Sequence, residues 1–298
     1  MKGAGRPVAK TLQGPIADPT LSLTEKFRLG LKALRFDPIF DSLSASGHAE
    51  AIAFSGATPS VLALHGFTGV PEEVRLVCEA ARDSGLETRA PVLPGHGSNP
   101  RQLARLSFDD VVRGVRPEFD ALRRRGPVIV VGLSMGALVA TELYLSAPGD
   151  VLGLGLLANA FLLPRPMPGT FLEWMQQVAF PDFGMPKWDT DIADAEARRT
   201  HVSYRLQPMR FAASMQSAGK RLFDELFRVH CPTLVVHGAY DRACPVENAW
   251  KVAERLGTPD RRVVILPRSR HVICRDLDHV QLKLEMASFF QRLKGKAS

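Results

Sequence analysis

The sequence predicts an α/β fold, in which helices flank a mostly parallel central sheet and a helical segment is inserted. From about residue 50, short apolar segments typical of buried strands alternate with longer segments typical of helices. The segments PVIVVGLS (127–134) and VLGLGLLAN (151–159) are apolar almost throughout, as parallel strands covered on both faces are. Between about residues 161 and 221 this alternation breaks, and prolines, aromatic residues and methionines accumulate.

The change in pattern divides the chain into three regions. Residues 1–45 form an N-terminal extension, residues 46–160 and 222–298 form the α/β core, and residues 161–221 form a helical cap. The Phe, Met and Trp content of the cap suits a cover over an apolar pocket. A helical subdomain with its own small core is the alternative.

Local signals mark the elements of the core in order. A helix over 71–85 begins at a Pro and ends at a Gly. A helix over 107–126 has Ser107 as its N-cap and a kink at Pro117. The other expected elements are strands over 50–54, 61–66, 86–95, 127–134, 151–159, 232–238 and 261–267, a final helix over 276–293, and cap helices around 192–204 and 208–227.

The N-terminal extension has two parts. Residues 1–20 are rich in Gly and Pro, which predicts a flexible tail, and they lack the apolar stretch of a secretory signal. The basic segment over 21–40 is compatible with a helix at a membrane surface. We expect it to pack on the domain instead, because a short apolar stripe usually faces a core. Four apolar residues form this stripe at helical spacing: Leu23, Phe27, Leu31 and Leu34.

Charge and hydropathy exclude several function classes. The net charge is +7, but the basic residues are scattered and do not interleave with aromatic residues, so we expect no nucleic-acid partner. The longest apolar run, VLGLGLLANAFLL (151–163), is too short to span a bilayer. We therefore expect a cytoplasmic protein with no integral membrane segment.

The four cysteines are Cys78, Cys231, Cys244 and Cys274, and their spacing matches no zinc site. Such sparse usage suits free thiols in a reducing cytosol. Cys244 and Cys274 each lie three residues beyond a candidate catalytic residue. We interpret them as small buried side chains, with a disulfide or redox role as the alternative.

The segment GLSMG (132–136) carries the strongest chemical signal. G-x-S-x-G between a strand and a helix is typical of a nucleophile elbow, a sharp turn that lifts the serine hydroxyl clear of the sheet. Both neighbours are present, because PVIVV precedes it and MGALVATELYL continues with helical periodicity. Small residues at Gly132 and Gly136 suit such a crowded turn. Ser134 is therefore predicted to be a nucleophile, with a plain Gly-rich corner as the alternative.

A serine hydroxyl needs a base, and the base needs an acid that orients it. In the chain order Ser, acid, His, the acid follows a late strand and the histidine follows the next strand. PTLVVHGAYDRACP (232–245) puts Asp241 in the first position, and VVILPRSRHVICRD (263–276) puts His271 in the second. Each could be an ordinary loop residue alone, but together they occupy consecutive positions behind the elbow.

Two backbone N–H groups are needed to stabilise the oxyanion of a tetrahedral intermediate. Met135, which follows the nucleophile, is expected to supply one of them. The loop within LALHGFTG (62–69) is expected to supply the other from Phe67. We interpret His65 as a structural hydrogen-bonding residue and His96 as a loop-shaping residue.

The segments HGFTG, LPGHG, GLSMG, HGAYD and SRHVICRDLDHVQLKLEMASFF resemble those of the α/β-hydrolase superfamily, specifically its small carboxylesterases and monoacylglycerol lipases. The resemblance covers about residues 50–295, and the first and last segments are the more specific. Two features depart from the family pattern: Ala137 stands where many relatives have a further Gly, and the N-terminal extension is longer than in compact members.

This resemblance implies an α/β-hydrolase fold, a catalytic triad of Ser134, Asp241 and His271, and an oxyanion hole formed by Phe67 and Met135. It also implies that the cap shapes an acyl-chain pocket. From the aromatic and Met content of the cap, we expect five residues to line this pocket: Phe171, Trp174, Met175, Phe180 and Trp188.

The function hypothesis is hydrolysis of a short- to medium-chain acyl ester or a monoacylglycerol through an acyl-enzyme, without a metal or organic cofactor. The substrate is then a small ester or lipid. With the same triad, acyl transfer to another alcohol and hydrolysis of a C–C bond are enzymatic alternatives. A ligand-binding relative that lacks catalysis is the non-enzymatic alternative.

Overall fold

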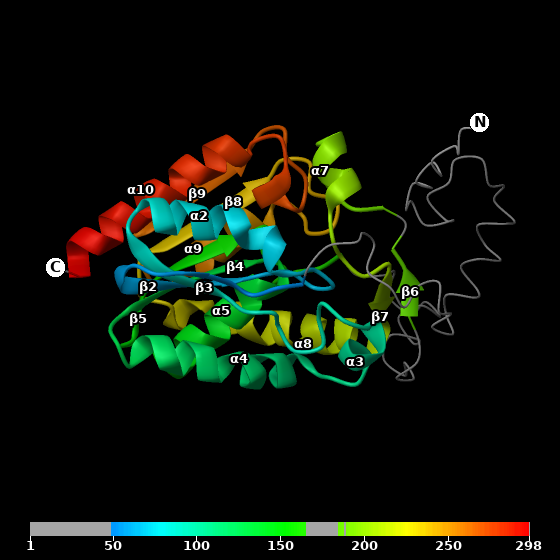
Figure 1. Ribbon diagram of the computed structural model, residues 1–298, viewed down its shortest axis with the longest axis horizontal. Coiled ribbons are helices and arrows are strands. Elements are labelled where there is room, and N and C mark those ends of the chain that lie inside the picture. Colours follow the sequence, from blue (N-terminus) through cyan, green and yellow to red (C-terminus); the bar gives the residue numbers. More distant parts are fainter. Residues whose placement is uncertain (1–48, 165–183, 188, 298) are drawn as a thin grey trace, which may run out of the picture.

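In the computed structural model, which describes residues 49–164, 184–187 and 189–297, a seven-stranded sheet forms the centre of the molecule (Figure 1). The strand order is β1-β3-β2-β4-β5-β8-β9, and every neighbouring pair is parallel except β1 with β3. The predicted α/β fold with a mostly parallel sheet is therefore confirmed. The strands are β1 (Ile52–Phe54), β2 (Ala57–Leu64), β3 (Leu86–Ala90), β4 (Val128–Leu133), β5 (Val151–Leu157), β8 (Thr233–Gly238) and β9 (Arg261–Leu266).

Both faces of the sheet are buried, which explains the continuously apolar strands. In β4, Val128 and Val130 belong to one hydrophobic cluster, whereas Ile129 and Val131 belong to the other. Helices α4, α5, α8 and α9 contribute to the first cluster, and α2 and α10 contribute to the second, on the opposite face (Figure 1). These helices are α2 (Arg75–Asp83), α4 (Phe108–Arg123), α5 (Met135–Ser146), α8 (Met209–Glu225), α9 (Asn248–Arg255) and α10 (His279–Ala297).

The predicted helix start and end signals lie close to the observed ends of α2 and α4. Helix α2 follows the 3-10 turn η2 (Pro71–Val74), and Gly85 beyond its end has a φ of 76°. At the start of α4, Ser107 and Asp110 form a capping box, in which the Asp110 carboxylate accepts the Ser107 N–H at 2.8 Å. Pro117 lies inside α4 and does not end it. The helix is therefore continuous through Pro117, and the kink that we expected there stays a prediction.

The structure also contains elements that we did not predict. They are the short helix α3 (Pro100–Ala104), helix α9, and a separate antiparallel pair formed by β6 (Gly184–Pro186) and β7 (Leu206–Pro208). Helix α9 buries Ala249, Val252 and Ala253 at helical spacing, so its signal was present in the sequence. The three-residue strands carry no periodic signal.

The described part of the predicted cap contains α7 (Ala195–Thr200) and most of α8. Helix α8 packs against α4 and α5, and Arg221 forms an ion pair of 2.6 Å with Glu142 of α5. The helix continues to Glu225 and so passes through the predicted boundary between residues 221 and 222. This part of the insertion is therefore attached directly to the core.

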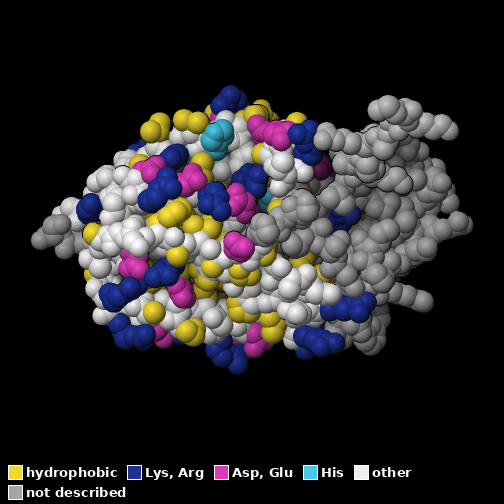
Figure 2. Space-filling view, in the orientation of Figure 1, with side chains coloured by type: hydrophobic (Ala, Val, Ile, Leu, Met, Phe, Trp, Pro, Cys, Tyr) yellow, Lys and Arg dark blue, Asp and Glu magenta, His cyan; other side chains and the backbone are white. Residues whose placement is uncertain are grey.

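The N-terminal extension, residues 1–45, lies outside the described residues. Among the residues that the structure does describe, no helix is long and apolar enough to cross a membrane. On the face shown in Figure 2, Lys and Arg side chains are interspersed with Asp and Glu. Many charged side chains of the described residues form ion pairs, such as Arg123 with Asp120. The positive charge is therefore scattered on this face, as the sequence indicated.

Candidate active site

Ser134 lies at the turn between β4 and α5, in a backbone conformation that few residues adopt. Its φ and ψ are 56° and −114°, a combination that costs of order 1–3 kcal/mol for a residue with a side chain. The neighbouring glycines permit this turn, because a Cβ at Gly132 would overlap the Gly136 carbonyl and a Cβ at Gly136 would overlap the Leu64 carbonyl. The Ser134 N–H also donates to the Leu157 carbonyl at 2.8 Å.

The sheet brings the predicted serine, acid and histidine together. They follow the parallel strands β4, β8 and β9, whose carboxyl ends lie at one edge of the sheet. His271 Nε2 lies 2.9 Å from Ser134 Oγ, and His271 Nδ1 lies 2.8 Å from Asp241 Oδ2. Because an ionised carboxylate only accepts hydrogen bonds, Nδ1 carries the proton and Nε2 accepts the serine O–H. This arrangement can remove the Ser134 proton.

The pKa shifts of Asp241 and His271 favour a negative charge on Asp241 and a positive charge on His271. Burial opposes ionisation of Asp241, but the nearby His271 and His237 and their hydrogen bonds lower its pKa well below the usual range. Burial likewise opposes protonation of His271, yet Asp241 raises its pKa above the ordinary value. Asp241 is therefore an anion that stabilises an imidazolium on His271, the charge that forms when Ser134 is deprotonated.

Asp241 is held by four groups. Its Oδ1 accepts the N–H groups of Ala243 and Cys244 at 2.9 and 2.8 Å, while Oδ2 faces His271 and also lies 3.0 Å from His237 Nε2. His237 is fully buried, and both atoms near its Nε2 are acceptors, the second being the Cys244 carbonyl at 3.2 Å. His237 Nε2 therefore carries a hydrogen, and this N–H donates a hydrogen bond to Asp241. We did not identify this residue from the sequence.

The loop that carries His271 is attached to the described part of the insertion. The Asp191 carbonyl accepts the N–H groups of His271 and Val272, while its carboxylate binds the Arg242 N–H and guanidinium. Asp276 is fully buried and accepts N–H groups from Ala193, Asp194, Arg270 and Leu277. The acid loop and the histidine loop thus share partners in residues 191–194.

The Phe67 loop lies directly against the nucleophile, since a Cβ built at Gly66 would lie 3.5 Å from Ser134 Cβ. The Leu93 N–H donates to His65 Nε2 at 3.1 Å, so His65 Nδ1 carries the proton and donates to the Gly66 carbonyl at 3.0 Å. Gly69 donates to the same carbonyl at 3.2 Å. These bonds orient the peptide group that carries the Phe67 N–H, because C=O and N–H point in opposite directions across a trans peptide.

Met135 is the first residue of α5, so its N–H belongs to the helix N-terminus, where amides have no partner within the helix. Of the two predicted oxyanion donors, Met135 thus follows Ser134 directly, and Phe67 follows Gly66, which lies against Ser134. His65 is engaged with backbone groups at both ring nitrogens, and His96 Nδ1 lies 3.0 Å from the Pro94 carbonyl. Both histidines have the structural contacts that we expected of them, and His271 is the histidine that lies beside the serine.

All four cysteines are buried free thiols, as we interpreted them. Burial, and after it the charge of Asp241, raises the pKa of the Cys244 thiol well above its ordinary value. This thiol is therefore protonated at neutral pH, which disfavours nucleophilic chemistry. Within the described parts of the chain, no group of His, Cys, Asp and Glu residues is arranged to hold a metal ion.

The predicted pocket residues lie outside the described residues: Phe171, Trp174, Met175, Phe180 and Trp188. Among described residues, the Phe67 ring stacks on Phe211 of α8, with centroids 5.4 Å apart and planes at 15°. This stacking joins the Phe67 loop to α8, a contact that the sequence analysis did not predict.

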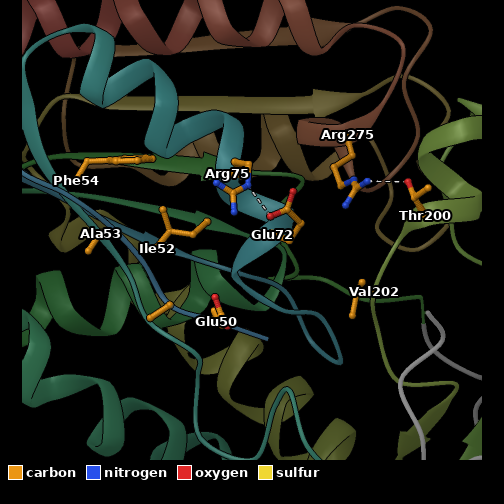
Figure 3. Close-up of a pocket in the computed structure, with 10 residues that line it drawn as sticks. Glu50, Ile52, Ala53, Phe54, Glu72, Arg75, Thr200, Val202 and Arg275 are labelled. Carbon is orange, nitrogen blue, oxygen red and sulfur yellow. Dashed lines mark hydrogen bonds and ion pairs between the residues drawn. The ribbon is translucent and has the colours of Figure 1, made fainter. Parts of the chain in front are cut away.

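A separate hollow of about 540 Å³ opens beside β1 (Figure 3). None of the three residues Ser134, Asp241 and His271 lines it. Its charged groups already have partners, because Arg75 pairs with Glu72 at 2.6 Å and Arg275 donates to Thr200 at 3.0 Å (Figure 3). This hollow is therefore distinct from the triad.

Comparison with known proteins places these features in context. The model of the family described as "Serine aminopeptidase, S33" matches residues 56–278. A thermostable monoacylglycerol lipase of Bacillus sp. is 27% identical over 250 residues, which cover 81% of this chain and 97% of the relative. A carboxylesterase of Bacillus subtilis is 23% identical over 80% of this chain and 95% of its own length.

Solved structures show the same fold. A monoacylglycerol lipase of Paleococcus ferrophilus superposes with a TM-score of 0.72 at 16% identity, over 82% of this chain and 98% of the other. A structure from a study of the metagenome-derived lipolytic enzymes LipS and LipT superposes with a TM-score of 0.74 at 24% identity, over the same shares of the two chains.

The contact between His237 and Asp241 predicts the effect of two substitutions. In His237→Leu, Asp241 loses a donor and holds His271 less firmly, so covalent labelling of Ser134 by a fluorophosphonate should slow by about 10- to 100-fold, the range for a hydrogen bond to a charged group. His237→Gln keeps an N–H donor and should label at a rate closer to wild type. Equal labelling rates for wild type and His237→Leu would contradict this role.

Proposed function

Because the chain belongs to the serine aminopeptidase S33 family, we propose that it is a serine hydrolase of carboxylic esters, acting on short- to medium-chain acyl esters or on monoacylglycerols. One observation carries this proposal: Ser134 donates to His271, and His271 donates to Asp241. This arrangement suits attack on a carbonyl group and stabilisation of the resulting oxyanion.

In the proposed acylation step, Ser134 Oγ attacks the ester carbonyl while His271 Nε2 takes the hydroxyl proton. The anionic Asp241 stabilises the imidazolium through Nδ1–H. The negative charge moves to the carbonyl oxygen, which accepts from the Phe67 and Met135 N–H groups; one such donor typically contributes about 3–4 kcal/mol of transition-state stabilisation. His271 then gives its proton to the departing alkoxide, which leaves as the alcohol.

Deacylation repeats these roles with water in place of the serine. His271 removes a proton from the water as it attacks the acyl carbon, and the same N–H groups stabilise the second oxyanion. When the tetrahedral intermediate collapses, Ser134 leaves and recovers its proton from His271. The products are a carboxylic acid and an alcohol, and no step needs a metal or organic cofactor.

The substrate class is inferred from the relatives and from the site. Two relatives whose sequences match most of this chain are named as a monoacylglycerol lipase and a carboxylesterase. The Phe67 ring is only partly buried and follows Gly66, which lies against Ser134, and this supports an apolar substrate group near the serine. We propose that residues 161–221 form the cap over this group. The four free thiols support a reducing compartment, and we propose the cytoplasm.

Replacement of the nucleophile tests the reaction. Ser134→Ala should reduce hydrolysis of p-nitrophenyl butyrate by roughly 10⁴- to 10⁶-fold and abolish fluorophosphonate labelling, because no hydroxyl remains to attack. Ser217→Ala, a change at an exposed serine of α8, is the matched control and should retain wild-type turnover.

The same assay resolves the substrate class. Acetate, butyrate, octanoate and palmitate esters of p-nitrophenol define acyl-chain preference, and an amino-acid p-nitroanilide tests the activity that the family description names. We expect the highest kcat/KM for butyrate or octanoate. If wild type neither hydrolyses these esters nor becomes labelled at Ser134, the proposed function is wrong.

The acid limb of the pH profile reports His271. Nε2 must be unprotonated to accept the serine proton, and Asp241 raises the His271 pKa. Activity should therefore be full above that pKa and fall as the pH drops through it, with the midpoint of kcat/KM above the ordinary histidine value of about 6.5. A profile that stays flat down to about pH 4.5 would exclude a histidine base.

A further inference from the structure

A buried carboxylate lies under the loop that carries Phe67. Glu73 belongs to η2, directly after this loop, and its side chain is almost completely buried. Its Oε2 accepts the Gly66 N–H at 2.9 Å, and its Oε1 lies 3.2 Å from His201 Nε2. The Glu73 side chain therefore contacts both the Phe67 loop and the inserted segment.

The loop backbone is shaped to receive this carboxylate. A Cβ at Gly69 would overlap the carboxylate of Glu73, and a Cβ at Gly66 would approach Oε2 to 3.1 Å. Gly66 and Gly69 thus allow the carboxylate to lie against the main chain of its own loop. The glycines of HGFTG consequently have a second function besides permitting the turn.

The carboxylate is ionised despite its burial. Burial alone would raise the Glu73 pKa, but contact with His201 and the nearby His65 and Lys187 lower it to about 2. An ionised carboxylate can only accept hydrogen bonds, so it holds the Gly66 N–H in one direction. Charge-assisted hydrogen bonds of this kind are stronger than neutral ones.

The inserted segment holds the same loop at a second place. Thr68 has a left-handed φ of 67°, which is unfavourable for a β-branched residue. Its carbonyl accepts the Tyr204 N–H at 2.9 Å, and its hydroxyl accepts from Lys187 Nζ at 3.4 Å. Lys187 also donates to Ser203 Oγ at 3.1 Å. The unfavourable conformation of Thr68 is thus stabilised from residues 187 and 203–204.

The Phe67 N–H lies between these restraints. On its N-terminal side, Glu73 holds the Gly66 N–H, and His65 and Gly69 hold the Gly66 carbonyl. On its C-terminal side, Tyr204 holds the Thr68 carbonyl. The direction of the Phe67 N–H is therefore set before a substrate arrives, which is the condition under which an oxyanion donor is most effective.

We propose that Glu73 is a positioning residue for the oxyanion hole, and that its contact with His201 makes the direction of the Phe67 N–H depend on the packing of the inserted segment against the loop. This inference rests on the proposed hydrolase function. It gives the insertion a role in transition-state stabilisation in addition to covering the acyl group.

A buried contact between a carboxylate and a histidine with no role in the reaction would behave differently. Breaking it would lower stability and the fraction of folded protein, but each folded molecule would turn over normally. Loss of oxyanion positioning lowers kcat per active site and leaves KM almost unchanged, because the oxyanion exists only in the transition state and intermediates. The two cases are separated when active sites are counted by fluorophosphonate titration.

The test compares Glu73→Gln with Glu72→Gln. Glu73→Gln keeps the side-chain shape but replaces the charged acceptor with a neutral amide. We expect kcat for p-nitrophenyl butyrate to fall about 10- to 100-fold, less than for complete loss of an oxyanion donor, with KM within about threefold of wild type. Glu72→Gln changes the neighbouring glutamate, which pairs with Arg75 away from the loop, and should behave as wild type.

A trifluoromethyl ketone provides the second measurement, because Ser134 adds to its carbonyl carbon and places the new oxyanion between the two N–H donors. Its inhibition constant should rise in Glu73→Gln by about the same factor by which kcat/KM falls. Wild-type kcat per titrated site, or a loss confined to KM, would overturn the proposal.

His201→Leu tests the link to the insertion and decides the question if Glu73→Gln fails to fold. It removes the partner of Oε1, so kcat should again fall while KM is retained. If Glu73→Gln and His201→Leu act through the same contact, the fold-loss in kcat of the double variant should be smaller than the product of the two single fold-losses. Wild-type kcat in His201→Leu would overturn the proposed link. If wild type itself lacks ester turnover and Ser134 labelling, the proposed function fails instead.

Discussion

The sharp turn at Ser134 is the constraint on which the other parts of the site depend. Its left-handed φ of 56° is possible only because Gly132 and Gly136 leave room for the crossing backbone. The turn places the hydroxyl 2.9 Å from His271 and begins α5 at Met135, so one conformation positions the proposed nucleophile and one of the proposed oxyanion donors. A strained residue at this place is retained because β4 precedes it, α5 follows it, and its N–H donates to the Leu157 carbonyl of β5.

Buried carboxylates hold the loops around this turn. Asp241, Asp276 and Glu73 each accept backbone N–H groups from loops that lie beyond the sheet edge. Loops lack the regular hydrogen bonds of strands and helices, so these side-chain acceptors supply the missing partners. The sheet thus sets the approximate positions of the reacting groups, and the carboxylates set the directions in which they point.

Short-range signals allowed the fold, and the proximity of Ser134, Asp241 and His271, to be predicted from the sequence. Apolar strands, Pro71, Gly85 and the Ser107 cap act locally, and the positions of Asp241 and His271 follow from chain order along parallel strands. Other partners are less visible in sequence. Glu73 meets His201, and Asp276 meets Ala193, across 128 and 83 positions, and nothing local distinguishes these residues from ordinary loop or helix residues. His237 was visible in HGAYD, but its role depends on a tautomer that only three-dimensional contacts reveal.

The central claim is that Phe67 and Met135 present preorganised N–H groups to an oxyanion formed on Ser134. A crystal structure of the enzyme phosphonylated at Ser134 tests it most directly, because the phosphoryl oxygen occupies the position of the oxyanion. We predict that this oxygen lies about 2.7–3.1 Å from both backbone nitrogens, with the loop unchanged at Gly66 and Thr68. A phosphoryl oxygen directed toward solvent, or a loop that must rearrange to reach it, would contradict the account.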